Sequence, residues 1–318
     1  MNIFVAPLNW GLGHASRCIP LIRQLQAEGH TIILGGEGES LTLLRKHFPD
    51  LRVLPLAPLH LTYGQGHRQV FAMLRALPRI IRSARLDHRM LADYLRFEQI
   101  DKVISDNRFG LYSDRVPCVY MTHQLVIPLP HPWQWLETLV AAMHRRLISR
   151  FAECWIPDEP VSTKAPQGYA GLLSHPAIVP ANTKYIGLLS RFAGISCQPD
   201  TTYSVVAVLS GLEPQRSLFE QEIIRRYKNA GETVLIVRGK MQLPPTVTRH
   251  NNITLIPWLD DSHLAAYMLG AKRIICRSGY SSVMDLAALG VLSKAELHPT
   301  PGQPEQEYLS KLLKKQTI

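Results

Sequence analysis

Short apolar runs alternate with segments of helical periodicity along almost the whole chain, and this alternation restricts the possible folds more than any other feature. Alternation of strands and helices is typical of a mostly parallel sheet flanked by helices. In the first part we expect strands at 3–8, 31–34, 51–54, 102–105, 118–121, 154–156 and 183–188, separated by helices at 15–28, 39–47, 69–97 and 133–150. In the second part we expect strands at 203–209, 233–237, 253–256 and 273–276, with helices at 214–228, 262–269, 281–289 and from about 303.

The chain is long enough for two domains, since 318 residues exceed one ordinary hydrophobic core. Periodicity fades between 158 and 200, where Pro, Gly and Ser become frequent, and we place a linker near 188–200. The predicted domains are therefore 1–190 and 191–318. The second is short, and the chain stops directly after the helix that begins near Gln303.

Composition excludes several classes of protein. The five cysteines are scattered and form no paired C-x-x-C motif, which argues against a disulfide framework or a zinc site and fits a reducing cytoplasm. The chain opens directly on an apolar strand, so we expect no signal peptide. No apolar run approaches the ~20 residues of a membrane-spanning helix. We expect a cytoplasmic protein that is soluble or at most peripheral on the inner face of the membrane.

The net charge of +10 is unevenly distributed, and the surplus peaks in the helix expected at 69–97. Pro78 is expected to kink or divide this helix. Between positions 68 and 96, seven arginines are accompanied by only two acidic residues. Five of the arginines follow helical spacing on one face, namely Arg75, Arg79, Arg82, Arg85 and Arg89. The apolar residues expected on the other face are Phe71, Leu74, Leu77, Ile81, Ala84 and Leu91. The arginine face is interpreted as a solvated surface or as a contact with an anionic membrane, and nucleic acid is its least favoured partner.

A glycine-containing loop with a histidine follows the first strand. Gly11 and Gly13 permit a tight turn into the next helix, and His14 lies at the start of that helix. Ligands of open α/β sheets bind at the carboxyl ends of the strands, which is where this loop lies. A dinucleotide site is the competing interpretation, with Glu37 or Glu39 as the ribose acid, but Ser16 occupies the place of the third glycine.

Two other strand ends of the first part also carry polar groups. Asp106, Asn107 and Arg108 follow the strand at 102–105, and His123 follows the strand at 118–121. Together with Gly11 and Gly13, Asn107 and Arg108 are assigned to an acceptor-side loop. His14, Asp106 and His123 are each candidates for a general base, because histidine and aspartate are common proton acceptors. The sequence does not choose among the three.

The last third of the chain carries a candidate site for a phosphate and a sugar. Backbone N–H groups at a helix N-terminus favour phosphate, and Asp285 lies one helical turn further, where its carboxylate can reach a neighbouring hydroxyl-rich group. A second helix start at 303–307 adds amides and carboxylates. The residues assigned to donor binding are Ser210, Gly211, Arg216, Arg238, Arg277, Ser278, Gly279, Ser281, Ser282, Asp285, Gln303, Glu305 and Gln306.

These motifs together resemble family 28 of the GT-B glycosyltransferases, which includes the lipid-linked UDP-N-acetylglucosamine transferase of peptidoglycan synthesis. The similarity involves the loop at 11–14, the loop at 210–216, the segment 276–288 and the segment 303–306. It implies two Rossmann-like domains that face each other across a cleft, with Asp285 on the ribose of a UDP-sugar. Three features depart from the family pattern: a glycine-poor first loop with Trp10, an Asp at 285 where Glu is commoner, and no terminal helix that crosses back to the first domain.

The resemblance therefore implies transfer of a sugar from a UDP-sugar, such as UDP-N-acetylglucosamine, to an acceptor hydroxyl of a lipid or cell-envelope glycan, and we expect a metal-independent direct displacement. No metal and no cofactor are expected, because no DxD-type carboxylate pair follows a predicted cleft strand. A UDP-sugar 2-epimerase of the same fold and a non-catalytic sugar-nucleotide-binding subunit are the alternatives.

Overall fold

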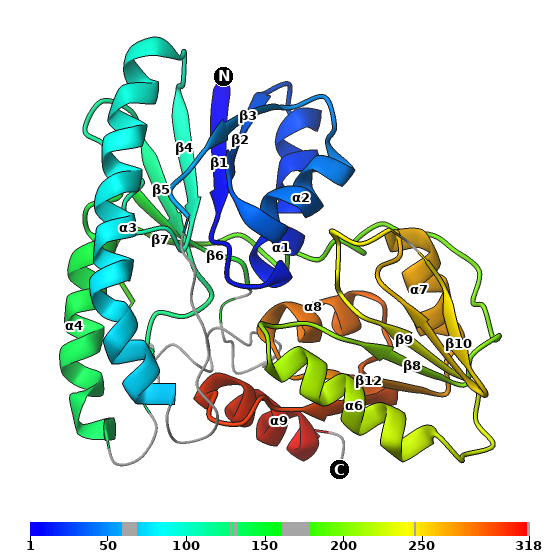
Figure 1. The fold of residues 1–318 in the computed structure, drawn as a ribbon. Helices are drawn as coiled ribbons and strands as arrows, with labels where there is room; N and C mark the ends of the chain where they lie inside the picture. Colours follow the sequence, from blue (N-terminus) through cyan, green and yellow to red (C-terminus); the bar gives the residue numbers. More distant parts are fainter. Residues whose placement is uncertain are drawn as a thin grey trace. The chain divides into compact units, whose positions relative to one another are not determined.

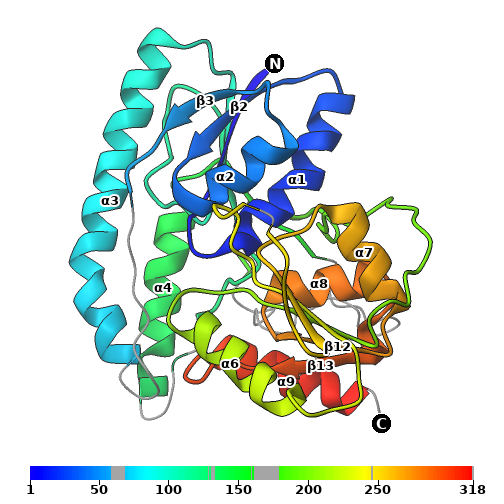
Figure 2. The same ribbon diagram turned by 45° about the vertical axis from the view of Figure 1, so that its right-hand side comes forward.

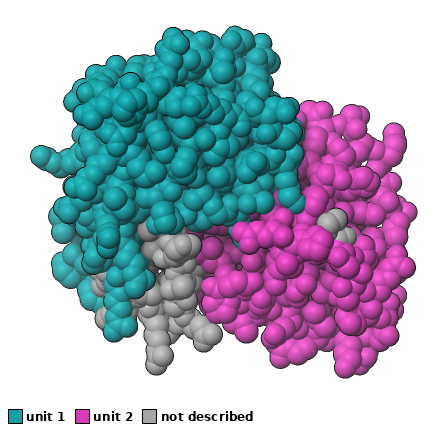
Figure 3. Space-filling model, turned by 45° about the horizontal axis from the view of Figure 1, so that its top comes forward, with its two compact units in different colours: residues 1–9, 14–61, 70–189 teal, residues 10–13, 62–69, 190–318 magenta. Residues whose placement is uncertain are grey.

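The computed structural model describes residues 1–58, 69–127, 129, 133–158, 160, 179–244 and 246–316. The chain forms two compact units, which Figure 3 shows in different colours. Unit 1 comprises residues 1–9, 14–61 and 70–189, and unit 2 comprises residues 10–13, 62–69 and 190–318. The division between Leu189 and Ser190 lies next to the boundary predicted at 190/191.

Unit 1 is built on a seven-stranded sheet whose strands all run parallel, in the order β3-β2-β1-β4-β5-β6-β7. The strands are β1 (Asn2–Pro7), β2 (Thr31–Gly36), β3 (Arg52–Pro55), β4 (Lys102–Asp106), β5 (Cys118–Met121), β6 (Glu153–Ile156) and β7 (Thr183–Tyr185). The central strands are almost wholly apolar and buried, as parallel strands covered on both faces must be.

The helices of unit 1 cover both faces of this sheet (Figures 1 and 2). Helices α1 (Leu12–Ala27) and α2 (Gly38–His47) connect β1 to β2 and β2 to β3. Helix α3 (Gln69–Phe97) then leads from β3 back across the sheet to β4. The short η2 (Trp133–Leu136) and α4 (Glu137–Ile148) connect β5 to β6, so the strand order now advances in the opposite direction. Because such connections are right-handed, the reversal puts α3 and α4 on the face opposite α1 and α2. The single helix predicted at 133–150 is thus divided into η2 and α4.

Helix α3 runs from Gln69 to Phe97 as one helix that includes Pro78, which does not divide it. On the face opposite the arginines, the Leu77 and Ile81 side chains remain 49% and 43% exposed. The side chains of Phe71 and Leu74 lie outside the described residues. From Ser83 onward the helix packs against the sheet, with Leu91 fully buried.

A buried ion pair attaches α3 to the loop that follows β4. The Arg108 guanidinium donates from Nε to Oδ2 of Asp87 and from Nη2 to Oδ1, both at 2.9 Å, and Nη2 also donates to the Ala57 carbonyl at 2.9 Å. Both side chains are almost completely buried. Helix and loop approach so closely at Gly110 that a Cβ atom there would lie 2.0 Å from the Ala84 carbonyl oxygen. Position 110 therefore accepts only glycine at this packing distance.

Unit 2 contains a six-stranded sheet in the order β10-β11-β9-β8-β12-β13, parallel except for the antiparallel pair of β10 and β11. The strands are β8 (Val205–Val208), β9 (Val234–Val237), β10 (Thr248–His250), β11 (Ile253–Ile256), β12 (Arg273–Arg277) and β13 (Ala295–His298). The sequence prediction missed both edge strands. β10 is fully exposed and polar, and β13 is only half-buried, so neither shows the apolar run of a central strand.

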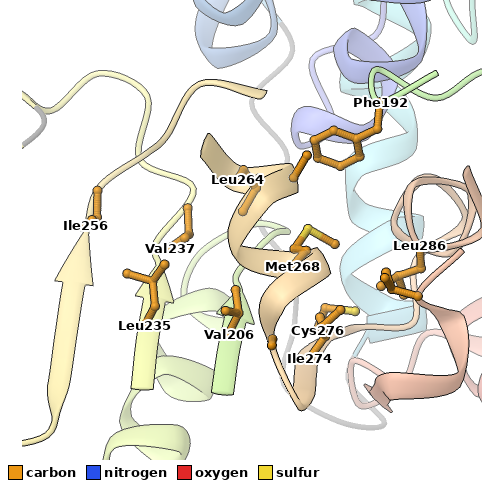
Figure 4. Close-up of a cluster of buried hydrophobic side chains, with 13 residues drawn as sticks. Phe192, Val206, Leu235, Val237, Ile256, Leu264, Met268, Ile274, Cys276 and Leu286 are labelled. Carbon is orange, nitrogen blue, oxygen red and sulfur yellow. The ribbon is translucent and has the colours of Figure 1, made fainter. Parts of the chain in front are cut away.

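The helices of unit 2 bury apolar side chains on both faces of the sheet. Helix α6 (Gln215–Tyr227) packs Phe219, Ile223 and Tyr227 on one face. Helices α7 (Asp261–Gly270) and α8 (Tyr280–Ala288) cover the other, where Leu264, Met268 and Leu286 surround Ile274 (Figure 4). The chain continues through η4 (Leu292–Lys294) and ends in α9 (Pro304–Gln316). Among the described residues, no helix combines the length and the apolar character of a membrane span.

The ion pair between Asp87 and Arg108 gives a stability prediction. The Asp87→Ala variant should lower the free energy of unfolding by about 3–5 kcal/mol, because it leaves a buried guanidinium without its carboxylate. Asp93→Ala on the same helix is the matched control: Asp93 is exposed and lies 3.7 Å from Arg96, so the change should cost less than about 0.5 kcal/mol. Urea unfolding measures both, and equal losses would contradict the structural importance of the buried pair.

Candidate functional site

The pairing of β1 with β4 brings two of the predicted strand ends together. Pro7 at the end of β1 lies opposite Asp106 at the end of β4, and the Leu8 amide donates to the Asp106 carbonyl at 2.9 Å. The chain then turns at Gly11, whose φ of 78° favours glycine, and enters α1 at Leu12. His14 consequently lies inside the first turn of α1, beside the Asp106 carboxylate.

Four side chains of unit 1 form a compact polar cluster, which we call the His14 cluster: His14, Arg17, Asp106 and His123. Nδ1 of His14 lies 3.0 Å from Oδ1 of Asp106. Arg17 donates from Nε to Oδ2 of Asp106 at 2.8 Å and from Nη2 to Oδ1. Its Nη1 lies 2.7 Å from Nδ1 of His123, and its Nη2 lies 2.9 Å from Nδ1 of His14. The three residues predicted as candidate bases therefore meet around one guanidinium.

The cluster is buried, and its charges shift the pKa of two of its members. Burial alone would raise the pKa of Asp106, but the charges of Arg17 and His14 outweigh that effect and hold this pKa well below its usual range. Asp106 is therefore ionised at neutral pH and acts as a hydrogen-bond acceptor. Burial lowers the pKa of His14, and Arg17 adds to this, while Asp106 opposes it. His14 is thus mostly neutral near pH 7, which is the form that accepts a proton.

Arg17 is the member of the cluster that the sequence interpretation did not assign to the site. It is 2% exposed and lies three residues after His14, on the same face of α1. The signal was available, because the loop motif extends to position 17 and an arginine in the core-facing stripe of a helix needs a buried anionic partner. Asp106 is that partner.

The residues assigned to the acceptor-side loop have different environments. Asn107 adopts a left-handed backbone with φ of 58° and accepts a hydrogen bond from the Tyr120 hydroxyl at 2.9 Å. Arg108 is buried in the ion pair with Asp87, so its charge is compensated inside unit 1. Gly13 belongs to the first turn of α1. Contact of these residues with an acceptor stays a prediction, and for Arg108 it would require the ion pair to rearrange.

In unit 2, the two helix starts that the sequence singled out lie side by side. Ser278 at the end of β12 donates from Oγ to the Gln306 carbonyl in α9 at 2.8 Å. A Cβ atom on Gly279 would lie 4.0 Å from both the Ser282 hydroxyl and the Gln306 amide nitrogen. Gly279 caps α8 with no side-chain hydrogen bond. The first backbone N–H groups of α8, near Ser281 and Ser282, thus lack a side-chain cap, as an anion site at a helix N-terminus requires.

The second helix start is organised by the Gln306 side chain. Its Oε1 accepts from the Thr300 amide at 2.8 Å, and its Nε2 donates to Oε1 of Gln303. Glu305 is half-buried in the first turn of α9. Gln303 and Gln306 therefore have fixed positions next to Gly279, which suits the predicted contact with a donor.

Asp285 is part of a buried polar network at the beginning of unit 2. The Ser190 hydroxyl donates to its Oδ1 at 2.6 Å, and Nε of Arg191 lies 3.6 Å from its Oδ2. The other end of Arg191 lies 3.3 Å from Asp261 in α7. Burial raises the pKa of Asp285 to about 6, although Arg191 and Ser190 oppose this effect. The sequence interpretation assigned this carboxylate to the donor and missed Ser190 and Arg191.

The three basic residues assigned to donor binding already have partners within unit 2. Arg216 donates to the Gly239 carbonyl at 2.8 Å and to Glu213 at 3.2 Å. Arg238 forms a bidentate ion pair with Glu220, with both contacts at 2.8 Å. Arg277 donates to the carbonyls of Pro299 and Gln215 at 3.1 and 3.3 Å. They connect neighbouring strand-end loops, and direct contact with a phosphate stays a prediction.

Ser210 and Gly211 follow β8 and lead into α6. Gly211 has a φ of 93°, which explains the glycine at this turn. The loop is exposed at Gly211 and half-buried at Ser210. The loop lies at a carboxyl strand end, and its strand β8 is next to β12 in the sheet order. Its contact with a phosphate stays a prediction.

Comparison with known proteins supports the fold. No family model matches the chain. An uncharacterized glycosyltransferase of Methanosarcina acetivorans is 22% identical over 322 residues, which cover 96% of this chain and 82% of that protein. The glycosyltransferase SsfS6 of Streptomyces sp. SF2575, complexed with thymidine diphosphate, matches with a TM-score of 0.59 at 13% identity, covering 99% of this chain and 86% of its own. UGT89C1 of Arabidopsis thaliana, complexed with UDP-L-rhamnose, matches with a TM-score of 0.58 at 14% identity, and the match covers 99% of this chain and 82% of that one.

The chain has the GT-B fold. Its two units, each with a mostly parallel sheet between helices, confirm the predicted fold class. The curated relative and the similar solved structures are glycosyltransferases.

The raised pKa of Asp285 predicts a pH-dependent stability. The pKa of about 6 in the folded state exceeds the ordinary value, so this carboxyl favours folding at low pH, and the contribution disappears as the pH rises through about 6. The Asp285→Asn variant removes the titration. The difference in free energy of unfolding, variant minus parent protein, should therefore increase by on the order of 2 kcal/mol as the pH rises from 4 to 7.5.

Urea unfolding at a series of pH values measures this difference. Asp200→Asn is a suitable control, because Asp200 is a carboxyl of unit 2 whose pKa is lowered by hydrogen bonds from Thr202. A difference between Asp285→Asn and the parent protein that stays constant with pH would contradict the raised pKa.

Proposed function

We propose that the chain is a glycosyltransferase that moves a sugar from a UDP-sugar to an acceptor hydroxyl, with His14 as the general base. The observation that carries the proposal is the His14–Asp106 contact at 3.0 Å at the carboxyl edge of the unit 1 sheet, in a GT-B fold. The motifs that resemble family 28 make UDP-N-acetylglucosamine the first donor to test.

His14 suits the role of base better than the other two candidates. Asp106 already accepts hydrogen bonds from Arg17 and has a pKa held well below its usual range, which makes it a poor proton acceptor. Nδ1 of His123 faces a guanidinium nitrogen of Arg17. Nδ1 of His14 lies close to both Oδ1 of Asp106 and Nη2 of Arg17, and Nη2 donates to that same Oδ1. With Nη2 directed at the carboxylate, Nδ1–H of His14 also donates to Asp106, and the lone pair of Nε2 remains for the proton of the acceptor hydroxyl.

The proposed reaction is a single displacement at the anomeric carbon. The acceptor oxygen forms a bond to this carbon while its proton passes to Nε2 of His14. The bond between the anomeric carbon and the phosphate oxygen breaks, and its electron pair leaves with the nucleoside diphosphate. Uncapped backbone N–H groups at the start of α8 would stabilise the charge that develops on the diphosphate. We propose that this step proceeds without a metal ion.

Donor binding is assigned to unit 2 and proton transfer to unit 1. Support comes from the two helix starts at Gly279 and Gln306 and from the nucleotide ligands named for the similar structures, which are thymidine diphosphate and UDP-L-rhamnose. Within this assignment, Asp285 would bind the ribose. Ser190 and Arg191 would then have to share this carboxylate with the ligand.

A UDP-sugar 2-epimerase and a non-catalytic subunit remain the alternatives. An epimerase would convert UDP-N-acetylglucosamine without an acceptor, which chromatography of the nucleotide sugars detects. A non-catalytic subunit would bind the donor but release no UDP. The His14 cluster favours the transferase, because a binding protein needs no buried base next to a carboxylate.

We propose further that the acceptor is lipid-linked and that unit 1 contacts an anionic membrane through α3 and α4. Arg75, Arg79, Arg82, Arg85 and Arg89 are all exposed, and none forms an ion pair with any residue that the structure describes. Exposed apolar side chains accompany them: Leu77 and Ile81 on α3, with Trp135, Leu139 and Met143 at 74%, 58% and 61% exposure on η2 and α4. A helix with both exposed basic and exposed apolar side chains suits an anionic interface better than it suits a solvated face.

The base assignment predicts a selective loss of turnover. His14→Gln should lower UDP release from a UDP-sugar, with a bacterial lipid extract as acceptor source, by about 100-fold to 10,000-fold. Binding of UDP, measured by calorimetry, should be unchanged, because His14 lies in unit 1. The parent protein should retain activity in EDTA.

His30→Gln provides the matched control, since His30 follows the same helix but lies outside the His14 cluster. A His14→Gln variant with more than a tenth of the parental rate would disprove the base assignment. If UDP and UDP-sugars fail to raise the melting temperature while NAD raises it, the donor assignment is wrong.

The membrane proposal predicts charge-dependent binding to vesicles. Arg79→Glu/Arg82→Glu should reduce co-sedimentation with vesicles that contain phosphatidylglycerol by at least about tenfold, because each basic residue near such a surface contributes about 1 kcal/mol. The double variant Leu139→Ser/Met143→Ser should also weaken binding to the vesicles, and its effect should persist at high salt because it removes apolar contacts rather than charges. Arg249→Glu on the exposed strand β10 is the control. Absence of binding by the parent protein would favour a solvated face, and tighter binding to RNA than to vesicles would favour a nucleic-acid surface.

A further inference from the structure

Arg17 has an unusual position for a charged side chain. It lies in the second turn of α1, is 2% exposed, and points to the carboxyl edge of the unit 1 sheet rather than to solvent. Burying a guanidinium is unfavourable unless its donors find acceptors. Three of its nitrogens lie within 3 Å of polar atoms of the His14 cluster.

These contacts restrict the protonation of His123. A guanidinium has donors only, so the Nδ1 atom of His123, 2.7 Å from Nη1 of Arg17, must be the acceptor of that hydrogen bond. The proton of the neutral imidazole ring is then on Nε2. His123 is thereby excluded as a base through Nδ1, and its ring orientation is fixed by Arg17.

The same guanidinium balances the charge of Asp106. Within the described part of the chain, the ionisable groups around His14 are Arg17 and Cys18 from α1, Asp106 from β4 and His123 after β5. Burial raises the pKa of the Cys18 thiol well above its ordinary value, so it adds no charge. Asp106 and Arg17 therefore contribute one negative and one positive charge beside His14, and burial decides in favour of the neutral ring. Without Arg17, the carboxylate would stand alone and would favour the imidazolium form.

We propose that Arg17 is a positioning residue that binds Asp106 and His123 together and thereby keeps His14 in its neutral, proton-accepting form. The inference rests on the proposed function for its catalytic meaning, but the charge balance itself is a property of the folded chain. Arginine is required because its planar fork reaches a carboxylate and an imidazole at the same time, which the single ammonium group of lysine does not.

The proposal is tested by titrating His14 directly. Histidine ring signals are followed by NMR between pH 4.5 and pH 9 in the parent protein and in variants, and the His14→Gln spectrum identifies the His14 signal. In Arg17→Met the His14 midpoint should rise by about one to three pH units, because the negative charge of Asp106 is no longer balanced. In Asp106→Asn it should fall, because the group that favours the imidazolium is gone.

The kinetic counterpart is the pH profile of UDP release. In Arg17→Met the acidic limb of kcat/KM should move to higher pH, and the rate should recover toward the parental value at alkaline pH. Arg17→Lys retains the charge and should keep the limb near its parental position with a lower kcat at every pH, since it binds only one of the two partners. A purely structural role would lower the rate uniformly, with no shift of the limb.

The two readouts separate this inference from the proposed function. If the parent protein releases no UDP, the transferase proposal fails, while the NMR titration still tests the charge balance. If Arg17→Met does not fold, the double variant Arg17→Met/Asp106→Asn removes both charges, and its His14 midpoint should lie between those of Asp106→Asn and the ordinary imidazole value. An unchanged His14 midpoint in Arg17→Met, or a protonated Nδ1 in the ¹⁵N spectrum of His123, would overturn the proposal.

Discussion

The parallel pairing of β1 with β4 is the constraint on which the candidate chemistry depends. It puts Pro7 opposite Asp106, so the chain that leaves β1 must start its first helix beside a buried carboxylate. His14 and Arg17 follow on one face of that helix, and β5, the next strand along, brings His123 to the same edge. The cluster is thus a result of strand order, because neighbouring parallel strands end at one edge of the sheet.

The two units differ in how they present polar groups. In unit 1 the central element is a buried charge pair, Arg17 with Asp106, surrounded by two imidazole rings. In unit 2 the candidate donor site consists mainly of backbone N–H groups, hydroxyls and amides, while its arginines are bound to carbonyls and carboxylates of neighbouring loops. This division fits a reaction in which one partner is deprotonated and the other, already an anion, only has to be bound.

Much of this arrangement could be predicted from the sequence, because buried parallel strands and the helices between them give strong periodic signals. His14, Asp106 and His123 were found from their positions after strands. Arg17 was not, although it lies in the core-facing stripe of its helix, because its partner Asp106 is 89 residues away along the chain and becomes adjacent only in the folded sheet. The edge strands β10 and β13 were missed because exposed strands lack apolar periodicity. The sequence placed Leu77 and Ile81 on the face opposite the arginines but could not show that they stay exposed, because helical spacing reveals a face but not what covers it.

The close packing of α3 on the loop after β4 has a consequence for the search for further relatives. Asp87 and Arg108 depend on each other, and Gly110 leaves no room for a side chain beside Ala84. Three positions on two separate elements are therefore expected to vary together during evolution, whereas the neighbouring exposed arginines of the same helix are free to drift. A chain that has diverged beyond recognition in its loops could still be traced by an aspartate in its third helix and an arginine followed two residues later by glycine.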